Sequence, residues 1–496
     1  MHFEVDWLKK WSMYSPQNIA LKDADTGRSF TYSQFFDFAN RGASLLSEKY
    51  QISKGDRVAV FSTNEAEYVF LFYALQRLGA IMVPINFRLT EKEVDHIVRD
   101  SSPKLLLTQT ALAPVIEKLQ SRPSHVGLLT GPDSFGEQIE KMSSVPEVPF
   151  QGFPEDAVKI LYTSGTTGSP KGAIVTHQML FWNSMNTTLR LNISQNDCTV
   201  IFLPFFHTGG WNVLTTPFFH RGAKIVLLKK FDPDHVLKHS EDEGATILFG
   251  VPTTMDMMYR SPTFKDVSLK SIRYAIVGGE PMPVPLIKSW ADKGIPVRQG
   301  YGLTEFGPNV FSLNEADAVR KIGSIGFPNF YIEAKVVDDE NRELGANEVG
   351  ELVLKGPMCM AGYWQNEKAT SETIVNGWLH TGDLVKRDDE GYYYVVGRKK
   401  DMYISGGENV YPAEVEKIIY GLPGVREVAV IGVADEKWGE VGKAFLVASN
   451  EMLNERGVLD YCQKHLAKFK IPKYIEFRSD LPKGDSGKIL KRALRP

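Results

Sequence analysis

The sequence predicts an α/β protein. Its large N-terminal domain would hold two doubly wound α/β subdomains plus a small β unit, and a small α+β domain would follow. Three observations support this fold class. Apolar strands alternate with helices of about 10–15 residues over residues 30–299, a pattern typical of a mostly parallel sheet. From about Gly323 the pattern changes to short strands and turns. Finally, a chain of 496 residues is too long for one hydrophobic core.

The first α/β segment is predicted from three helices and three strands. A helix over 30–49 begins near Thr31, a residue type that caps helix N-termini, and a helix over 65–79 ends on Gly79. Residues 132–156 are rich in Pro, Gly, Ser and Glu, so we expect a surface connection there. The remaining elements of this segment are a helix over 90–101 and strands over 57–61, 81–85 and 105–107.

The second α/β segment begins at a glycine-rich loop between two predicted strands, 158–162 and 173–175. Its length is similar to that of the first segment, which favours two subdomains of the same kind. Its further predicted elements are strands over 224–228, 246–251, 272–278 and 297–299, and a helix over 286–293.

A domain boundary is predicted at Lys400, which divides the chain into residues 1–399 and 400–496. Before it, strands over 349–355 and 392–396 with acidic turns form the small β unit. After it, the helix and strand patterns describe one compact α+β domain. They predict helices over 413–420 and 459–467 and strands over 425–433, 444–448 and 474–477.

Composition excludes several classes of protein. A net charge of −3 argues against a nucleic-acid binder, which usually carries a basic excess. The three cysteines, Cys198, Cys359 and Cys462, are too far apart for a metal-ligand spacing and indicate free thiols in a reducing compartment. Residues 1–7 do not resemble a signal peptide, and no apolar run reaches the roughly 18 residues of a membrane span. We therefore expect a cytoplasmic protein without a transmembrane segment.

The loop 163–172 has the sequence Thr-Ser-Gly-Thr-Thr-Gly-Ser-Pro-Lys-Gly. Its glycines let backbone N–H groups approach a ligand, and its hydroxyls and Lys171 add donors and one positive charge. This set suits a polyphosphate, although the same residue types also form ordinary polar turns. The loop is not a Walker A motif, because Gly172 follows Lys171 where that motif has Ser or Thr.

Five further stretches carry residues suited to chemistry, and each also has a plain structural interpretation. A histidine among aromatic residues can be a core residue, an acid after a strand can be a turn residue, and a basic run can be a solvated face. The stretches are 203–211 with His207, 299–305 with Glu305, 378–383 with Asp383, 397–409 with Lys400, and 481–488 with Lys488.

The joint order of these stretches resembles the adenylate-forming superfamily of acyl-CoA synthetases, nonribosomal-peptide adenylation domains and firefly luciferase. The resemblance extends from Phe30-Thr31-Tyr32 to Lys488 and is greatest to fatty-acyl-CoA ligases. It implies that ATP and a carboxylic acid form an acyl-adenylate and pyrophosphate, after which the acyl group passes to CoA.

The resemblance also implies roles for single residues in nucleotide binding. Glu305, with Thr163, would bind Mg²⁺, and Thr304 would contact the α-phosphate. Asp383, assisted by Arg398, would bind the ribose hydroxyls. The residues that would hold the β- and γ-phosphates are Thr163, Ser164, Gly165, Thr166, Thr167, Gly168 and Lys171. Those expected around adenine are Gly279, Glu280, Pro281, Gly300, Gly302 and the stacking residue Tyr301.

In this superfamily the C-terminal domain is mobile, with a hinge that matches Lys400 here. Lys488 would stabilise charge while the acyl-adenylate forms. Rotation would then withdraw Lys488 and bring Ser405, Gly406 and Gly407 beside a tunnel for the pantetheine arm of CoA. Small residues fit that place because a thin thiol arm must pass close to the backbone.

The acyl pocket is expected to involve 206–216, 278–281 and 301–309, with His207 at the reacting carboxylate or as a gate. Residues 202–216 include no Asp, Glu, Lys or Arg, so this stretch offers no partner for the ammonium of an amino acid or for a second carboxylate. This favours a medium- or long-chain fatty acid. The pocket residues singled out are Phe206, Gly209, Gly210 and Trp211.

Several alternatives stay open at this point. The acid could be an aryl acid or succinylbenzoate, or a stand-alone acyl-AMP ligase could load a separate carrier protein. An oxygenase of the luciferase type and a non-catalytic nucleotide-binding protein are rival classes, and the presence of Glu305, Asp383 and Lys488 argues against the second. The expected partners are small molecules. A homodimer and a peripheral membrane contact are compatible with the sequence.

Overall fold

The computed structural model describes residues 5–163, 170–449, 453–484 and 489–495. The chain folds as two compact units. The first unit comprises Met1–Glu333 and Leu354–Leu379, and the second comprises Ala334–Val353 and His380–Pro496. The motion of residues 400–496 as one domain, about a hinge at Lys400, stays a prediction.

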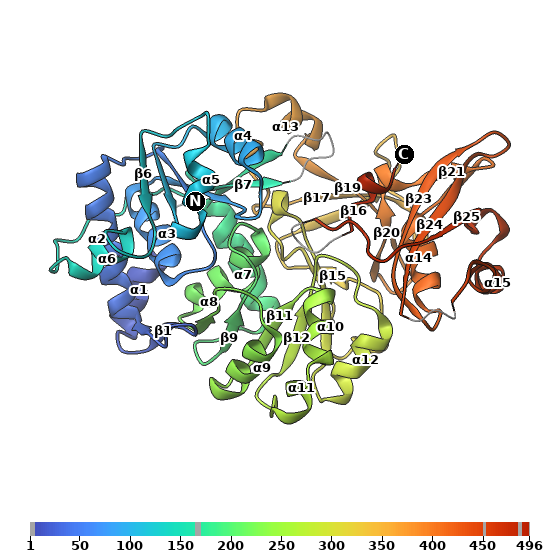
Figure 1. Ribbon diagram of the computed structural model, residues 1–496, viewed down its shortest axis with the longest axis horizontal. Helices are drawn as coiled ribbons and strands as arrows, with labels where there is room; N and C mark the ends of the chain where they lie inside the picture. The colour runs from blue at the N-terminus through green and yellow to red at the C-terminus, as the bar shows by residue number, and fades with distance from the viewer. Residues whose placement is uncertain (1–4, 164–169, 450–452, 485–488, 496) are drawn as a thin grey trace. The chain divides into compact units, whose positions relative to one another are not determined.

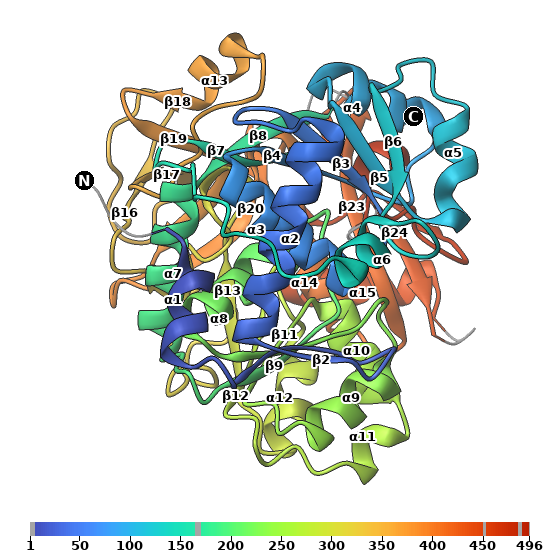
Figure 2. The ribbon, with the colours of Figure 1, turned by 90° about the vertical axis from the view of Figure 1, so that its left-hand side faces the viewer.

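A six-stranded sheet carries the glycine-rich loop of the first unit. Its order is β6-β5-β3-β4-β7-β8, and its pairs are parallel except β7 with β8. Figure 2 shows helices α2 and α3 lying together beside β3 and β4. The bounds are β3 Arg57–Phe61, β4 Ile81–Ile85, β5 Leu105–Thr108, β6 His125–Leu128, β7 Ala157–Thr163, β8 Lys171–Thr176, α2 Tyr32–Tyr50, α3 Ala66–Leu78, α4 Glu91–Ser101 and α5 Ala113–Glu117.

A four-stranded sheet in the order β2-β1-β10-β9 joins distant parts of the chain. Leu21 of β1 pairs in parallel with Ile225 of β10, so the second α/β segment takes a strand from the N-terminal region. The sequence pattern did not predict this exchange, because strand pairing is not local. The bounds are α1 Trp7–Tyr14, β1 Ile19–Asp23, β2 Ser29–Thr31, α7 His177–Leu191, β9 Cys198–Ile201, α8 Thr215–Arg221 and β10 Lys224–Leu227.

A third, five-stranded sheet has the order β11-β12-β13-β14-β15, of which β11, β12 and β13 are parallel. Figure 1 shows α9, α10, α11 and α12 gathered around β11 and β12. Buried side chains such as Trp290 and Leu248 fill the space between these layers. The bounds are α9 Pro233–Asp242, β11 Ile247–Gly250, α10 Pro252–Arg260, α11 Thr263–Asp266, β12 Tyr274–Val277, α12 Val284–Asp292, β13 Val297–Tyr301, β14 Phe311–Ser312 and β15 Phe327–Pro328.

Helix boundaries follow the capping residues. Thr31 caps α2 through a capping box with Gln34, and Gly79 ends α3 with φ of +65°, a conformation that glycine adopts without strain. The expected surface connection 132–156 is corrected in one part, since helix α6, Phe135–Lys141, lies within it. Phe135 is buried against Gly42, so this segment belongs to the core as well as to the surface.

The second unit is built around antiparallel strand pairs. Strand β19 pairs with β20, and the long strands β23 and β24 pair with each other beneath the buried faces of α14 and α15. Helix α13, Glu367–Thr373, and strand β18, Ile374–Val375, belong to the first unit. The other bounds are β16 Glu333–Val337, β17 Gly350–Lys355, β19 Trp378–Arg387, β20 Tyr393–Arg398, β21 Tyr403–Ser405, β22 Glu408–Val410, α14 Pro412–Tyr420, β23 Val425–Asp435, β24 Gly439–Ala448, α15 Glu455–His465 and β25 Tyr474–Phe477.

The predicted α/β class is confirmed. Within the described ranges, no helix combines the length and the apolar character needed to span a lipid bilayer.

Candidate active site

The two ends of the glycine-rich loop are held together by strand pairing. Thr163, the last residue of β7, pairs with Lys171, the first residue of β8. The loop therefore starts and finishes at one point of the sheet edge. Ser164, Gly165, Thr166, Thr167 and Gly168 lie outside the described residues, so their predicted phosphate contacts stay predictions.

Glu305 lies beside this point. It is the middle residue of a short 3₁₀ turn, Thr304–Phe306, that follows β13. Its Oε1 atom is 3.3 Å from the Thr163 hydroxyl, although 142 residues separate the two. The structure thus brings together the two residues expected to bind a metal ion.

Tyr363 is a third member of this cluster, and the sequence analysis missed it. Its hydroxyl donates to Glu305 Oε1 at 3.1 Å. Burial and then the Glu305 carboxylate raise the pKa of Tyr363, so the phenol keeps its proton and acts as a donor. The Lys171 ammonium lies 5.3 Å from the centre of the Tyr363 ring.

Backbone pairing explains why Tyr363 reaches this place. The Ile174 N–H donates to the Gly362 carbonyl at 2.9 Å, and the Trp364 N–H donates to the Gly172 carbonyl at 2.7 Å. Residues 362–364 therefore run along β8 as an added edge. The signal in the sequence was weak, a Gly-Tyr-Trp triplet far from any motif.

The chemistry of this cluster suits Mg²⁺ bound together with phosphates. Mg²⁺ prefers oxygen ligands and is usually held by one or two carboxylates plus phosphate oxygens and water. Thr163 and Glu305 offer a hydroxyl and a carboxylate at one point. Among the described residues, no group of three or more His, Cys, Asp or Glu side chains forms a complete metal cage. The donor set therefore fits a metal ion whose other ligands come from a nucleotide.

The segments expected around adenine lie at one edge of the five-stranded sheet. Val277 of β12 is in register with Gln299 of the parallel strand β13, so residues 278–281 leave the sheet beside Gly300 and Tyr301, the last residues of β13. In α/β sheets this carboxyl edge is where ligands bind. Gly279 has φ of +87°, and a Cβ on Gly302 would lie 2.1 Å from the Pro308 carbonyl oxygen. Glycine is thus required at both turns.

Phe249 at the end of β11 connects two parts of the expected acyl pocket. A methyl group placed on Gly209 or on Gly278 would in each case lie 3.7 Å from the Phe249 ring. The loop after β9 and the loop after β12 therefore meet at one aromatic ring. Phe206 is buried, and its ring centre is 4.5 Å from that of His207.

The fold itself requires Gly210 and Trp211 at their positions, apart from any contact with a substrate. A Cβ on Gly210 would lie 2.3 Å from the Pro204 carbonyl oxygen, so its small size is needed by the turn itself. Trp211 is fully buried and stacks on Phe205, with ring centres 4.2 Å apart. Their contribution to an acyl pocket stays a prediction.

Lys159 is a buried cation that the sequence analysis did not consider. It lies in β7 and is fully buried, and its ammonium donates to Asn212 Oδ1 at 2.9 Å. The rings of Phe72 and Trp211 lie 4.6 and 4.8 Å from Nζ, close enough for cation–π contacts. Burial lowers the pKa of Lys159 well below its usual value. Residues 202–216 contain no charged side chain, yet a lysine of a neighbouring strand contacts them.

In the second unit, Asp383 and Arg398 form the pair that was expected to bind ribose. They are cross-strand neighbours in β19 and β20, and Arg398 Nε lies 2.7 Å from Asp383 Oδ1. Asp383 is buried, and its backbone N–H donates to the Thr381 hydroxyl at 3.1 Å. Its carboxylate is thus held in one orientation.

The glycine pair on the expected CoA side is the turn of a hairpin. Ser405 pairs with Glu408 across β21 and β22, and Gly406 and Gly407 between them have φ of +61° and +88°. Two-residue hairpin turns with positive φ at both positions strongly favour glycine. Lys400 is exposed to solvent, and the protein around it lowers the pKa of its ammonium through partial desolvation. Lys488 lies outside the described residues.

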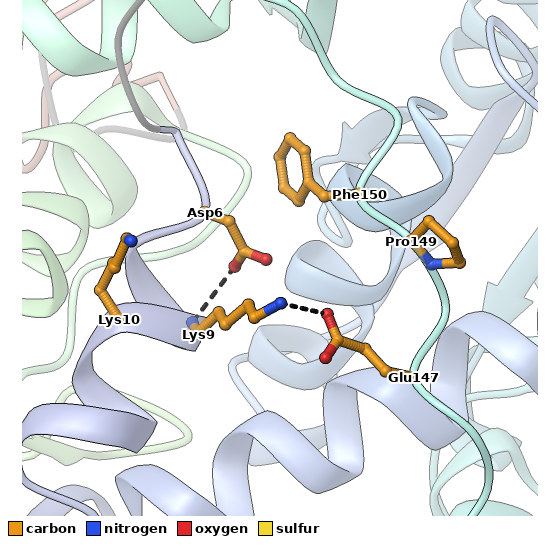
Figure 3. A pocket seen from close by; sticks show the side chains of 6 residues that line it. All are labelled: Asp6, Lys9, Lys10, Glu147, Pro149 and Phe150. Carbon is orange, nitrogen blue, oxygen red and sulfur yellow. Dashed lines mark hydrogen bonds and ion pairs between the residues drawn. The ribbon is translucent and has the colours of Figure 1, made fainter.

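A surface pocket of about 410 Å³ lies elsewhere on the first unit. Figure 3 shows its lining residues, Asp6, Lys9, Lys10, Glu147, Pro149 and Phe150. Lys9 spans it and pairs with Glu147 at 2.7 Å. None of these residues belongs to the segments expected to bind ATP, CoA or the acid.

Comparison with known proteins identifies the family. The model of the AMP-binding enzyme family matches residues 8–364, and that of the AMP-binding enzyme C-terminal domain matches residues 414–488. The long-chain-fatty-acid–CoA ligase FadD13 of Mycobacterium tuberculosis is 40% identical, over 99% of this chain and 98% of that protein. A feruloyl-CoA synthase of an Amycolatopsis species is 37% identical over the same shares.

A solved structure agrees with these relatives. The o-succinylbenzoate CoA synthetase of Bacillus subtilis, in complex with its acyl-adenylate intermediate, is 32% identical with a TM-score of 0.89, covering 99% of this chain and 97% of that one. The chain therefore belongs to the AMP-binding enzyme family of adenylate-forming enzymes and is an AMP-forming acid–thiol ligase, an acyl-CoA synthetase.

Proposed function

We propose that this acyl-CoA synthetase activates a medium- or long-chain fatty acid. The main support for the proposed chemistry is the cluster of Thr163, Glu305 and Tyr363 at the ends of the glycine-rich loop. It offers a carboxylate and a hydroxyl for a metal ion where the phosphates of ATP are expected. Bound Mg²⁺ would neutralise charge on the leaving pyrophosphate.

The reaction needs two steps because a carboxylate has no good leaving group. In the first step, a carboxylate oxygen of the acid bonds to the α-phosphorus of ATP, and the bond to pyrophosphate breaks. Thr304 contacts the α-phosphate, and Lys171 with the loop holds the phosphates that leave. In the second step, the CoA thiolate attacks the acyl carbonyl, and AMP leaves with the bonding electrons.

Each remaining residue has one proposed role. Tyr301 stacks on adenine, and the Asp383 carboxylate accepts hydrogen bonds from the ribose hydroxyls. Lys488 stabilises charge in the first step only. Ser405, Gly406 and Gly407 serve the second step, after the C-terminal domain has turned at Lys400.

The proposed acid follows from the charges around the pocket. Residues 202–216 supply no charged group, and Phe206 and Phe249 present aromatic surfaces. A second carboxylate, as in succinylbenzoate, needs a cation that it can reach. Lys159 is fully buried and donates to Asn212, and the Arg88 guanidinium lies 5.9 Å from the centre of the Phe206 ring, so succinylbenzoate belongs in the test below. An aryl acid is the second candidate, because the pocket surfaces are aromatic and one relative is named for feruloyl-CoA.

Pyrophosphate exchange and hydroxamate trapping test this proposal. The acids would be saturated chains of about 2 to 18 carbons, ferulate, benzoate and succinylbenzoate. We expect the strongest signal above about eight carbons, in line with added buried methylene groups. Preferential trapping of amino acids or of succinylbenzoate would overturn the proposed acid, and no exchange with any acid would overturn the enzyme assignment.

Omission of CoA identifies the acceptor. With CoA present we expect acyl-CoA to form and turnover to continue. Without it, the acyl-adenylate should accumulate to about one equivalent per enzyme. An enzyme that releases no acyl-CoA but loads an added carrier protein would instead be an acyl-AMP ligase.

A further inference from the structure

Lys159 is not explained by packing. Burying an ammonium group is costly, and the cost is offset only in part by one neutral hydrogen bond and two aromatic faces. Among the described residues, no carboxylate pairs with it. A methionine would fill a similar volume without a charge. A residue that lowers stability in this way points to a role outside the core.

The partner of Lys159 is held in one orientation. A lysine ammonium only donates hydrogen bonds, so the side-chain oxygen of Asn212 must face Lys159. The amide nitrogen then faces the other way, and it donates to Thr208 Oγ1 at 3.1 Å. The direction of both hydrogen bonds is therefore fixed by the lysine.

The backbone around Asn212 is also fixed. Its carbonyl accepts hydrogen bonds from Asn183 at 2.7 Å and from Asn309 at 3.1 Å. Asn309 follows the Glu305 turn, and Asn183 lies in α7. Asn212 thus joins β7, α7 and the segment after Glu305 and is almost fully buried.

The chain of hydrogen bonds ends at Thr208, next to His207. Thr208 Oγ1 accepts from Asn212, and its hydroxyl hydrogen has no acceptor among the described residues. Thr208 also precedes Gly209, which faces Phe249 across from Gly278. The hydroxyl hydrogen is therefore available at the loop where the acid is expected.

We propose that Lys159 is a positioning residue for the acid. It acts through Asn212, so that the Thr208 hydroxyl donates a hydrogen bond to an oxygen of the substrate carboxylate. Donors that point in one direction polarise one another, and a chain that begins with a cation ends in a strengthened donor. The proposal rests on the proposed function, because it needs a carboxylic acid in this pocket.

Two single variants and their combination test the proposal in pyrophosphate exchange with the best acid of the panel. Lys159→Met and Thr208→Val should each raise the KM for the acid about tenfold, the effect of losing a hydrogen bond to a charged group. The KM for ATP should stay within about twofold, because ATP is not expected to contact the hydrogen bonds that join Lys159, Asn212 and Thr208. The double variant should be no worse than Thr208→Val alone, because both act through one hydroxyl.

Thermal midpoints separate this role from a structural one. Lys159→Met should unfold at the same temperature as the wild type or higher, because an uncompensated buried charge has gone. Thr199→Val is the matched control. Thr199 is a fully buried threonine of β9 whose hydroxyl has no hydrogen-bond partner in the described part of the chain. It should leave both KM values unchanged.

The following outcomes overturn the proposal. Lys159 would be only a core residue if Lys159→Met left the KM for the acid unchanged. The same conclusion would follow if the effects multiplied in the double variant, or if the KM for ATP rose as much as the KM for the acid. If Lys159→Met does not fold, the KM for the acid is compared between Thr208→Ser, which keeps a hydroxyl, and Thr208→Val, which does not. Equal KM values in these two variants would refute the proposal. Failure of the wild type to exchange with any acid would instead refute the proposed function.

Discussion

Tyr363 donates a hydrogen bond to Glu305 Oε1 at 3.1 Å across 58 residues of sequence. The same oxygen lies 3.3 Å from the Thr163 hydroxyl. One carboxylate oxygen is therefore fixed by two donors, which leaves the other side of the carboxylate for a metal ion. The tyrosine thus holds in place the group on which the proposed phosphate chemistry depends.

Tyr363→Phe should weaken the use of Mg·ATP. Without the phenol hydrogen bond the carboxylate is less well oriented, and we expect the KM for Mg·ATP to rise about tenfold. The acid KM should stay constant. Tyr393→Phe is a suitable control, because it also removes a tyrosine hydroxyl, one that donates to the Ala334 carbonyl at 3.4 Å and bonds to Arg387. Equal changes in both variants would contradict a special role for Tyr363.

Glu305→Gln should abolish most of the first step. The amide keeps the shape of the side chain but loses the charge that binds Mg²⁺, so exchange should fall about 100-fold. The Mg²⁺ concentration for half-maximal exchange should also rise. Glu147→Gln, which removes the charge that pairs with Lys9 and Arg77, should change neither quantity. An unaltered Mg²⁺ dependence in Glu305→Gln would place the metal elsewhere.

Lys488→Ala should separate the two steps. Formation of acyl-adenylate from acid and ATP should drop by about 100-fold or more, because a cation at the reacting centre is lost. Thioester formation from preformed acyl-adenylate and CoA should fall by less than about threefold. Single-turnover assays of each step give the comparison. Similar losses in both steps would argue against a domain that turns between them.

Alanine substitutions at Gly406 and Gly407 should lower the stability of the fold by unequal amounts. Gly406→Ala places a methyl group 2.8 Å from the Trp438 ring at φ of +61°, whereas Gly407→Ala at φ of +88° meets no atom within 4 Å. We expect backbone strain of about 1–2 kcal/mol in both and a further loss from the clash in Gly406→Ala. Urea unfolding measures the difference. Equal destabilisation would show that Trp438 moves aside without cost.

Acid should destabilise the fold through His177. Burial lowers the pKa of His177 to about 4, opposed in part by Asp156. The unfolded chain takes up this proton below about pH 6.5, but the folded protein does so only near pH 4. Stability is therefore complete above about pH 6.5 and is lost as the pH falls towards 4, by about 3 kcal/mol in all.

Urea unfolding at pH 7 and pH 4.5 checks this assignment. His177→Gln should reduce the loss of stability between the two pH values, since glutamine binds no proton. The wild type and the variant would lose stability in parallel if His177 were already charged in the folded protein.

Local signals predicted the elements well. The strands 57–61, 81–85 and 474–477 were predicted with the bounds that the structure has, because alternation and apolar runs depend on neighbouring residues. The cap at Thr31 is local in the same way. Helix α6 was missed because its seven residues lie among prolines and serines, and only the contact of Phe135 with Gly42 explains its burial.

The sequence by itself determined the family, and it predicted the residues expected to carry the chemistry, because these lie in short segments of distinctive spacing such as 163–172 and 299–305. Only the tertiary structure decided which side chains support them. Tyr363 reaches Glu305 by backbone pairing with β8, Phe249 joins Gly209 to Gly278, and Lys159 meets Asn212 between strands. These contacts depend on strand order and register, which form between residues far apart in the chain and leave no local pattern to recognise.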